Sequence, residues 1–246
     1  MTAFPQRTRV LRPVALCVAL ALPACSPAPA GSDINDPYEA QNRAVHEENK
    51  RLDTAVFGGP GRESREPGPF VKGLANVGSN LKAPRNVVNG ILQADPEIAV
   101  TNTFRFVINS TFGLAGLFDP ATALGIPRKD TDFGATLARW GVPEGAYLEL
   151  PVVGPSTERD AAGRIVDLAL DPVYWYLGTP GAYGAFALQS ASRIESRQRF
   201  AGTYESILYG SADSYAQARL LYLQSRRYEL GQEEEVFDPY EDPYAQ

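Results

Sequence analysis

Cys25 is the residue whose position most clearly indicates a chemical role. It follows an apolar run, Val14 to Leu22, that is preceded by three arginines and continues as Pro23-Ala24-Cys25. A basic start, a short apolar segment and a small-residue exit are typical of a secretory signal peptide. The stretch Leu22-Pro23-Ala24-Cys25 resembles the bacterial lipobox, in which the thiol receives a diacylglycerol before cleavage just ahead of the cysteine. We therefore expect Cys25 to become the mature N-terminus, carrying S-diacylglycerol and an N-acyl chain.

The alternative interpretation is an ordinary secretory signal that ends near a cysteine by chance. The apolar run is about half of the roughly 20 residues that a membrane-spanning helix needs. Attached acyl chains would instead anchor the protein, because each buried methylene contributes about 0.8 kcal/mol. Ser26 stands where an aspartate would retain the protein at the inner membrane, so the sequence favours the outer membrane.

Catalytic chemistry is poorly represented. His46 is the only histidine and lies in the polar run HEENKR. A Ser-His or Cys-His pair, or a histidine-bearing zinc site, would have to use it, but a lone histidine on a charged helix face is most often solvated. No G-x-S-x-G motif, P-loop or dinucleotide-binding glycine motif occurs. We predict that the protein is not an enzyme and has no cofactor or metal site.

Composition restricts the other classes of function. The 246-residue chain has a net charge of −6, and loss of residues 1–24, which contain three arginines and no acids, makes it −9. So acidic a chain is a poor candidate for nucleic-acid binding. We divide it into a signal peptide (1–24), a lipidated cysteine with a flexible tether (25–35), a helical domain (36–231) and an acidic, disordered tail (232–246).

The domain is expected to be all-α, with mostly short helices. Asp-Pro pairs precede helix-compatible segments, at 36–37, 95–96, 119–120 and 171–172. Asp accepts hydrogen bonds from the free amides of a first turn, and Pro suits the first helical position. Longer helical patterns fill 182–208 and 212–230, and only Tyr147 to Val153 reads as extended.

One segment breaks the usual amphipathic rule. From Glu97 to Asn109, apolar residues lie nearly all round the expected helix, with Arg105 as the only interior charge. Such a helix is either deeply buried or in lipid, and burial is the commoner explanation. The next stretch, 109–121, is rich in glycine and bulky apolar residues. Its glycines suit either close helix packing in a membrane or turns.

These residues, taken in order, resemble the MlaA (VacJ) family of outer-membrane lipoproteins. The resemblance covers nearly all of residues 36–230. It rests on the motifs DPYEAQNR (36–43), NGILQADP (89–96), RFVINSTFGLAGLFDPA (105–121), DFGATLARWGV (132–142), GAYLELPVVGPSTERDAAG (145–163) and DPVYWY (171–176). The sequence departs from the family at Gln41, His46 and Glu48, which make the first helix more polar than usual.

The resemblance implies a flattened, ring-like helical domain with an amphipathic central channel, lipid-anchored on the periplasmic-leaflet side of the outer membrane beside a trimeric porin. It implies that mislocalised phospholipids leave the outer leaflet through the channel and pass to a periplasmic lipid carrier of the MlaC type. Lipid asymmetry of the outer membrane would thereby be maintained. The alternatives are a structural, porin-associated envelope lipoprotein with no transport role, and a lipid hydrolase.

Two sets of residues are candidates for contact with lipid. Apolar candidates for channel or membrane-facing walls are Phe104, Phe112, Leu114, Leu117 and Phe118, whose alternative role is ordinary core. Candidate head-group contacts are Lys82, Arg85 and Arg105, because cations beside an apolar channel attract phosphate. Salt bridges to Asp or Glu are the alternative for these cations.

Overall fold

The computed structural model describes residues 34–59 and 66–232. The signal peptide, Cys25, most of the tether and nearly all of the acidic tail lie outside these ranges. The described part is mostly helical, as expected. Its elements are α2 (Glu39–Phe57), α3 (Pro69–Leu92), α4 (Pro96–Thr111), α5 (Pro120–Ala123), α6 (Phe133–Arg139), β1 (Tyr147–Leu150), β2 (Gly154–Thr157), α7 (Glu158–Leu170), α8 (Pro172–Arg199), α9 (Ala201–Leu208) and α10 (Ser214–Glu229).

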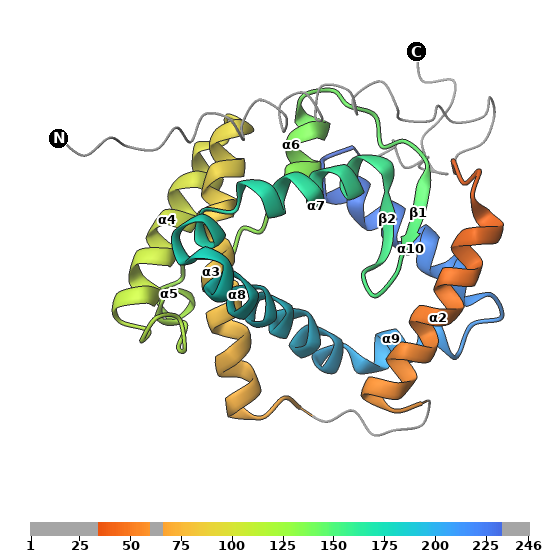
Figure 1. Ribbon diagram of the computed structural model, residues 1–246, viewed down its shortest axis with the longest axis horizontal. Helices are drawn as coiled ribbons and strands as arrows, with labels where there is room; N and C mark the ends of the chain where they lie inside the picture. Colours follow the sequence, from red (N-terminus) through yellow and green to blue (C-terminus); the bar gives the residue numbers. More distant parts are fainter. Residues whose placement is uncertain (1–33, 60–65, 233–246) are drawn as a thin grey trace, which may run out of the picture.

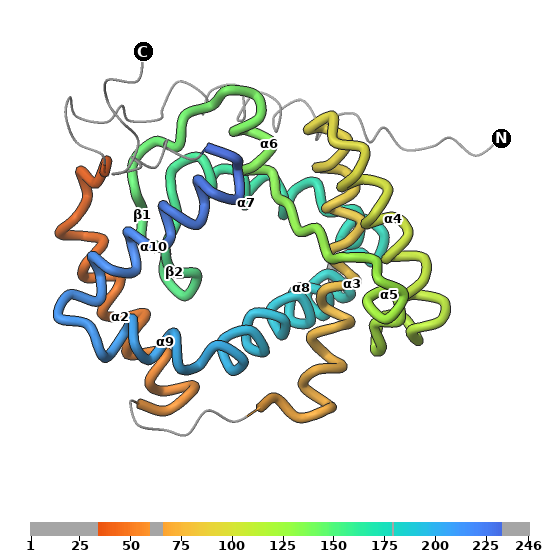
Figure 2. The backbone as a smooth tube through the Cα atoms, turned by 180° about the vertical axis from the view of Figure 1, so that it is seen from behind, coloured from red at the N-terminus to blue at the C-terminus, as the bar shows by residue number. Residues whose placement is uncertain are grey.

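The elements follow one another around a ring. Figure 1 shows α7 and the β-hairpin on one side of this ring and α8 with α9 on the other, with α3 and α4 at one end. The view from behind in Figure 2 shows the same closed course, with α2 and α10 at the end opposite α4. The ring-like architecture implied by the family resemblance is thus confirmed.

Three of the four Asp-Pro pairs begin helices as predicted. Asp95, Asp119 and Asp171 each accept a hydrogen bond from a backbone amide of the first turn, and a proline follows each of them at the first helical position. At the fourth pair, α2 begins two residues later without a side-chain cap. Asp36 instead pairs with Arg219 of α10, so this aspartate joins the two ends of the domain.

A β-hairpin replaces the single extended segment expected at 147–153. β1 and β2 pair antiparallel, with Tyr147 opposite Thr157 and Leu150 opposite Gly154. Asn42 of α2 holds the outer edge of β1, since its Nδ2 donates to Tyr147 O at 3.0 Å and its Oδ1 accepts from Glu149 N at 2.9 Å. The amide side chain thus continues the strand pairing and fixes α2 against the hairpin.

The helical pattern at 182–208 is divided in the structure. α8 ends at Arg199 and α9 begins at Ala201, and the DPVYWY segment is the first part of α8. Gly178 inside α8 has φ 66° and ψ −177°, which marks a kink that glycine accommodates without steric cost. α8 packs closely on α3, where a Cβ on Gly78 would stand 1.9 Å from Leu188 O.

The domain has no single hydrophobic centre among its described residues. One apolar cluster contains Phe133, Leu137 and Val166, and another contains Tyr147, Tyr215 and Leu223. Many buried side chains are polar, whereas many large apolar side chains are exposed. A ring packs each segment only against its neighbours, so apolar side chains remain available for its outer and inner surfaces.

Candidate functional site

α4 presents apolar side chains outward and polar ones inward. Its buried residues are Asn102, Arg105 and Asn109, whereas Phe104 is 57% exposed and Phe112, just after the helix, is 79% exposed. A helix on the surface of a water-soluble protein shows the reverse arrangement. Burial in a core, the commoner explanation for this segment, is therefore wrong here.

The apolar surface extends beyond α4 into the loop that follows. We call these exposed side chains the α4 surface: Val100, Phe104, Val107, Phe112, Leu114, Leu117, Phe118 and Leu124. All five apolar candidates from the sequence belong to it. Exposed apolar patches of this kind mark sites of contact with protein or membrane. Within the described ranges, no helix is long and apolar enough to cross a bilayer.

The loop behind the α4 surface is held by a buried ion pair. Arg105 Nη2 donates to the two carboxylate oxygens of Asp119 at 2.9 and 2.7 Å, and Nη1 donates to Ile126 O at 2.5 Å. Burial alone would raise the pKa of Asp119, but hydrogen bonds from Thr122, Asn109 and Arg105 lower it. Arg105 thus forms a salt bridge, which is the alternative to a head-group contact.

Gly116 helps to shape this loop as a turn glycine. Its φ is +93°, and a Cβ there would meet the Asn80 side chain at 2.5 Å. The neighbouring residues Leu114 and Ala115 also have positive φ, of 51° and 58°. The loop therefore folds back tightly onto α3 and projects the bulky side chains of the α4 surface outward.

Lys82 and Arg85 stand one turn apart on α3 and reach toward two other helices. Lys82 Nζ donates to Ser192 Oγ of α8 at 2.5 Å, and Arg85 Nε lies 3.9 Å from Asp167 Oδ1 of α7. Burial lowers the pKa of Lys82 to about 8, and repulsion from Arg193 adds to the effect. Within the described ranges, neither cation has a carboxylate at hydrogen-bond distance, whereas Arg105 has Asp119.

Arg164 and Arg193 join this region although the sequence did not single them out. Arg193 follows Ser192 on α8, and Arg164 lies one turn before Asp167 on α7. No local pattern distinguishes them from ordinary surface arginines. Only the packing of α3 against α7 and α8 brings them close to Lys82 and Arg85.

His46 is buried, which corrects the expectation of a solvated side chain. Its Nε2 lies 3.1 Å from Ser214 Oγ and its Nδ1 lies 3.4 Å from Glu149 Oε1. The order serine, histidine, acid matches that of a hydrolase triad. However, Ser214 is buried in the first turn of α10, and none of the three residues lines the two cavities that lie beside α6 and α10. We assign the network to holding α2, β1 and α10 together.

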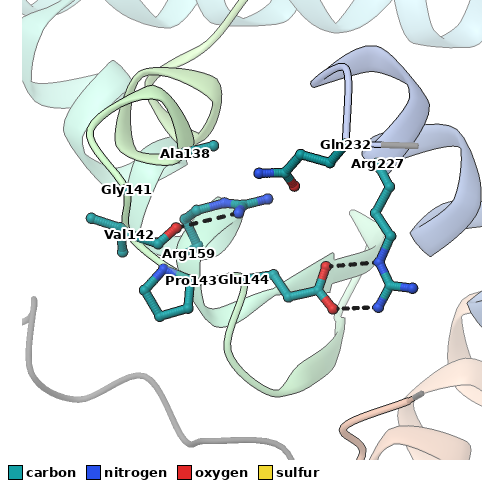
Figure 3. Close-up of a pocket in the computed structure, with 8 residues that line it drawn as sticks. All are labelled: Ala138, Gly141, Val142, Pro143, Glu144, Arg159, Arg227 and Gln232. Atoms are coloured by element: carbon teal, nitrogen blue, oxygen red, sulfur yellow. Dashed lines mark hydrogen bonds and ion pairs between the residues drawn. The ribbon is translucent and has the colours of Figure 1, made fainter. Parts of the chain in front are cut away.

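A cavity of about 320 Å³ opens between α6, α7 and α10. Figure 3 shows Glu144 paired with Arg227 on one side of it and the Arg159 guanidinium beside Gln232 on the other. Arg159 donates to Val142 O at 3.4 Å, and its Nη2 has no hydrogen-bond partner. In the part of the chain that the structure describes, no group of potential metal ligands gathers.

Comparison with known proteins places these features in context. The sequence matches the family model described as MlaA lipoprotein over residues 34–229. It is 31% identical over 225 residues to the intermembrane phospholipid transport system lipoprotein MlaA of Haemophilus influenzae, covering 88% of each chain. It is 32% identical over 218 residues to the corresponding protein of Escherichia coli K12, covering 86% of this chain and 84% of that one.

A solved structure is also similar. It comes from a study of the structural basis for maintenance of bacterial outer membrane lipid asymmetry. The TM-score is 0.62 at 27% sequence identity, with 79% of this chain and 98% of the other covered. The similarity therefore extends over nearly the whole of the solved chain.

Proposed function

The chain belongs to the MlaA lipoprotein family, and from this premise we propose that it is an outer-membrane lipoprotein of intermembrane phospholipid transport. It removes mislocalised phospholipids from the outer leaflet and passes them toward the periplasm, so that lipid asymmetry is maintained. The observation that carries the proposal is the inverted polarity of α4 in a ring-shaped domain. Apolar side chains on the outside suit acyl chains, and a ring provides a route that does not require a membrane-spanning helix.

The α4 surface contacts the acyl chains of the membrane in this proposal. Phe104, Phe112 and Leu114 are more than half exposed, and moving such side chains from water into lipid is favourable at about 25 cal/mol per Å². The buried Arg105–Asp119 pair keeps the surface rigid. The ring then sits beside the hydrocarbon of one leaflet, on the periplasmic side.

Lys82 and Arg85 bind the phosphate of a passing lipid. Both lie on α3, where Lys82 bonds to Ser192 of α8 and Arg85 approaches Asp167 of α7. An ammonium and a guanidinium form charge-assisted hydrogen bonds to phosphate oxygens. No bond in the lipid is made or broken, so the protein acts as a conduit and not as an enzyme.

Family membership also suggests how the protein is anchored and which proteins it contacts. Cys25 carries the lipid anchor, which keeps the ring at the outer membrane. A trimeric porin holds the ring in the membrane plane. A periplasmic carrier of the MlaC type receives the lipid at the exit.

The test measures phospholipid exposed in the outer leaflet of cells that lack this gene. The cells are complemented with wild type, Cys25→Ala, or Cys17→Ala as a control within the same apolar run. We expect exposed phospholipid to rise on deletion and to be restored by wild type and by Cys17→Ala, but not by Cys25→Ala. An unchanged outer leaflet after deletion would overturn the transport proposal in favour of a structural role.

A further inference from the structure

Four cations from three helices converge at one side of the ring. We call Lys82 and Arg85 of α3, Arg164 of α7 and Arg193 of α8 the basic cluster. Lys82 donates to Ser192, which precedes Arg193 on α8, and Arg85 approaches Asp167, which lies one turn after Arg164 on α7. Partial desolvation lowers the pKa of Arg193, although its side chain is exposed, and repulsion from Arg164 and Arg85 lowers it further.

The charge of the basic cluster is not balanced by acids. Within the described residues, no carboxylate lies within 4.0 Å of the charged nitrogens of Lys82, Arg164 or Arg193. Asp167 is the only described acid within that distance of Arg85. Asp167 is itself occupied, since Oδ1 accepts from Asn89 Nδ2 at 2.8 Å and Oδ2 accepts from Phe133 N at 3.1 Å. Arg85 Nε is buried without a hydrogen-bond partner.

The surroundings make this concentration of positive charge unusual. Asp130 also lies near Lys82 but is bonded to Asn86 at 3.2 Å. Arg128, another neighbour of Lys82, lies 3.8 Å from Asp119. The whole chain carries a net charge of −6, so a local excess of cations is opposite in sign to the rest of the protein. Uncompensated charge is costly where water is partly excluded, and an anionic ligand would remove that cost.

We propose that the basic cluster makes the protein select phospholipids with a net negative head group over zwitterionic ones. This inference rests on the proposed transport function. Both lipid classes offer a phosphate to Lys82 and Arg85. A phosphatidylethanolamine head group also carries an ammonium, which Arg164 and Arg193 repel, whereas phosphatidylglycerol carries only hydroxyl groups beside its phosphate. Repulsion of the second charge therefore sets the preference.

The experiment uses the full-length lipoprotein purified in detergent. The protein is equilibrated with mixed micelles of equal phosphatidylglycerol and phosphatidylethanolamine, re-isolated, and its bound lipids are extracted and quantified. We expect wild type to be enriched about three- to tenfold in phosphatidylglycerol, as one or two partly screened charge interactions would produce. Arg164→Gln/Arg193→Gln should hold lipid of a composition close to that supplied.

A matched variant controls for net charge. Arg51→Gln/Lys72→Gln removes two cations that pair with exposed glutamates elsewhere on the ring, and it should keep the wild-type preference. A wild-type composition equal to the supplied mixture would overturn the selectivity, and so would equal enrichment in Arg164→Gln/Arg193→Gln. Absence of any bound phospholipid would instead overturn the transport proposal, and the selectivity with it.

A second titration separates a lipid from a free anion. Glycerol 3-phosphate carries a phosphate without acyl chains, and we expect it not to displace bound phosphatidylglycerol at millimolar concentration. Displacement at that concentration would assign the cluster to a soluble phosphate and overturn lipid selection.

Discussion

Lys82 is a residue whose charge opposes folding. Its pKa falls from 10.5 to about 8, first because it is buried and then because Arg193 repels it. The unfolded chain therefore binds a proton more tightly at this site than the folded chain does. By linkage, the cost to stability is fully present below pH 8, decreases as pH rises, and disappears above the unfolded pKa. A cation kept at such a cost is consistent with a role in binding an anion.

Replacing Lys82 with methionine should stabilise the protein while impairing transport. At pH 7 we expect the free energy of unfolding to rise by about 1–3 kcal/mol. This is less than the free energy equivalent to the full pKa shift, because the side chain is partly exposed. Urea unfolding at pH 7 and 9.5 measures the difference, which should shrink at the higher pH. Lys72→Met, at an exposed lysine of the same helix, is the control. An equal increase in the free energy of unfolding at both pH values would contradict the lowered pKa of Lys82.

In α4, hydrogen bonds of the polar residues explain why the apolar face of the helix is exposed. Asn102 donates to Lys129 O and Arg105 donates to Ile126 O, both in the loop between α5 and α6, and these bonds fix the inner face. With the polar residues committed inward, Val100, Phe104 and Val107 face outward. The helix is therefore oriented by its hydrogen bonds, and the apolar side chains occupy the opposite face.

Leu114 offers a test of the α4 surface that should leave the fold intact. It is 66% exposed and has φ 51°, a left-handed conformation that Asp and Asn adopt more readily than Leu. Leu114→Asp should therefore unfold at a temperature within about 2 °C of wild type, since surface substitutions usually change stability by under about 0.5 kcal/mol. It should nevertheless fail to restore lipid asymmetry, because it places a charge in contact with acyl chains.

The control for this substitution is Leu114→Met, which keeps the side chain apolar and should complement fully. Leu117 is a poorer site for the test, because its Cδ1 lies against Gly73 of α3. Normal lipid asymmetry in cells carrying Leu114→Asp would remove this position from the transport surface.

At the scale of the molecule, the ring depends on a few tight interfaces instead of one core. The two apolar clusters lie at α6–α7 and at the hairpin with α10, whereas α3 and α8 are joined by close backbone approach at Gly78. Such an interface has little room for additional atoms, because packed interiors are as dense as organic crystals. The α3–α8 contact also carries three of the four residues of the basic cluster. Its geometry therefore matters for stability and, in the proposed function, for lipid binding.

Gly78→Ala should destabilise the whole ring. The added Cβ would stand 1.9 Å from Leu188 O, so the helices must separate, at a cost of about 1–3 kcal/mol or more. Gly184→Ala on α8 is the control, since nothing lies within 4 Å of its Cβ, and it should be neutral or stabilising by up to about 1 kcal/mol. Thermal unfolding followed by circular dichroism measures both. Equal stability of the two variants would contradict the proposed role of the interface.

Local sequence patterns predicted the features that depend on neighbours in the chain. The helix starts at Asp95, Asp119 and Asp171 were correct because a cap and a following proline act within one turn. The order of motifs was enough to identify the family, and with it the ring. The lipid anchor at Cys25 stays a prediction, since that residue lies outside the described ranges.

The tertiary structure decided which face of each helix points where and which distant residues meet. Periodicity can show that α4 has an apolar face, but whether that face meets protein or lipid depends on where Arg105 and Asn109 find partners. His46 is separated from Ser214 by 168 residues and Lys82 from Ser192 by 110, so no local pattern could bring them together. The burial of His46 and the assembly of the basic cluster follow from helix packing, because burial and charge repulsion act through space and not along the chain.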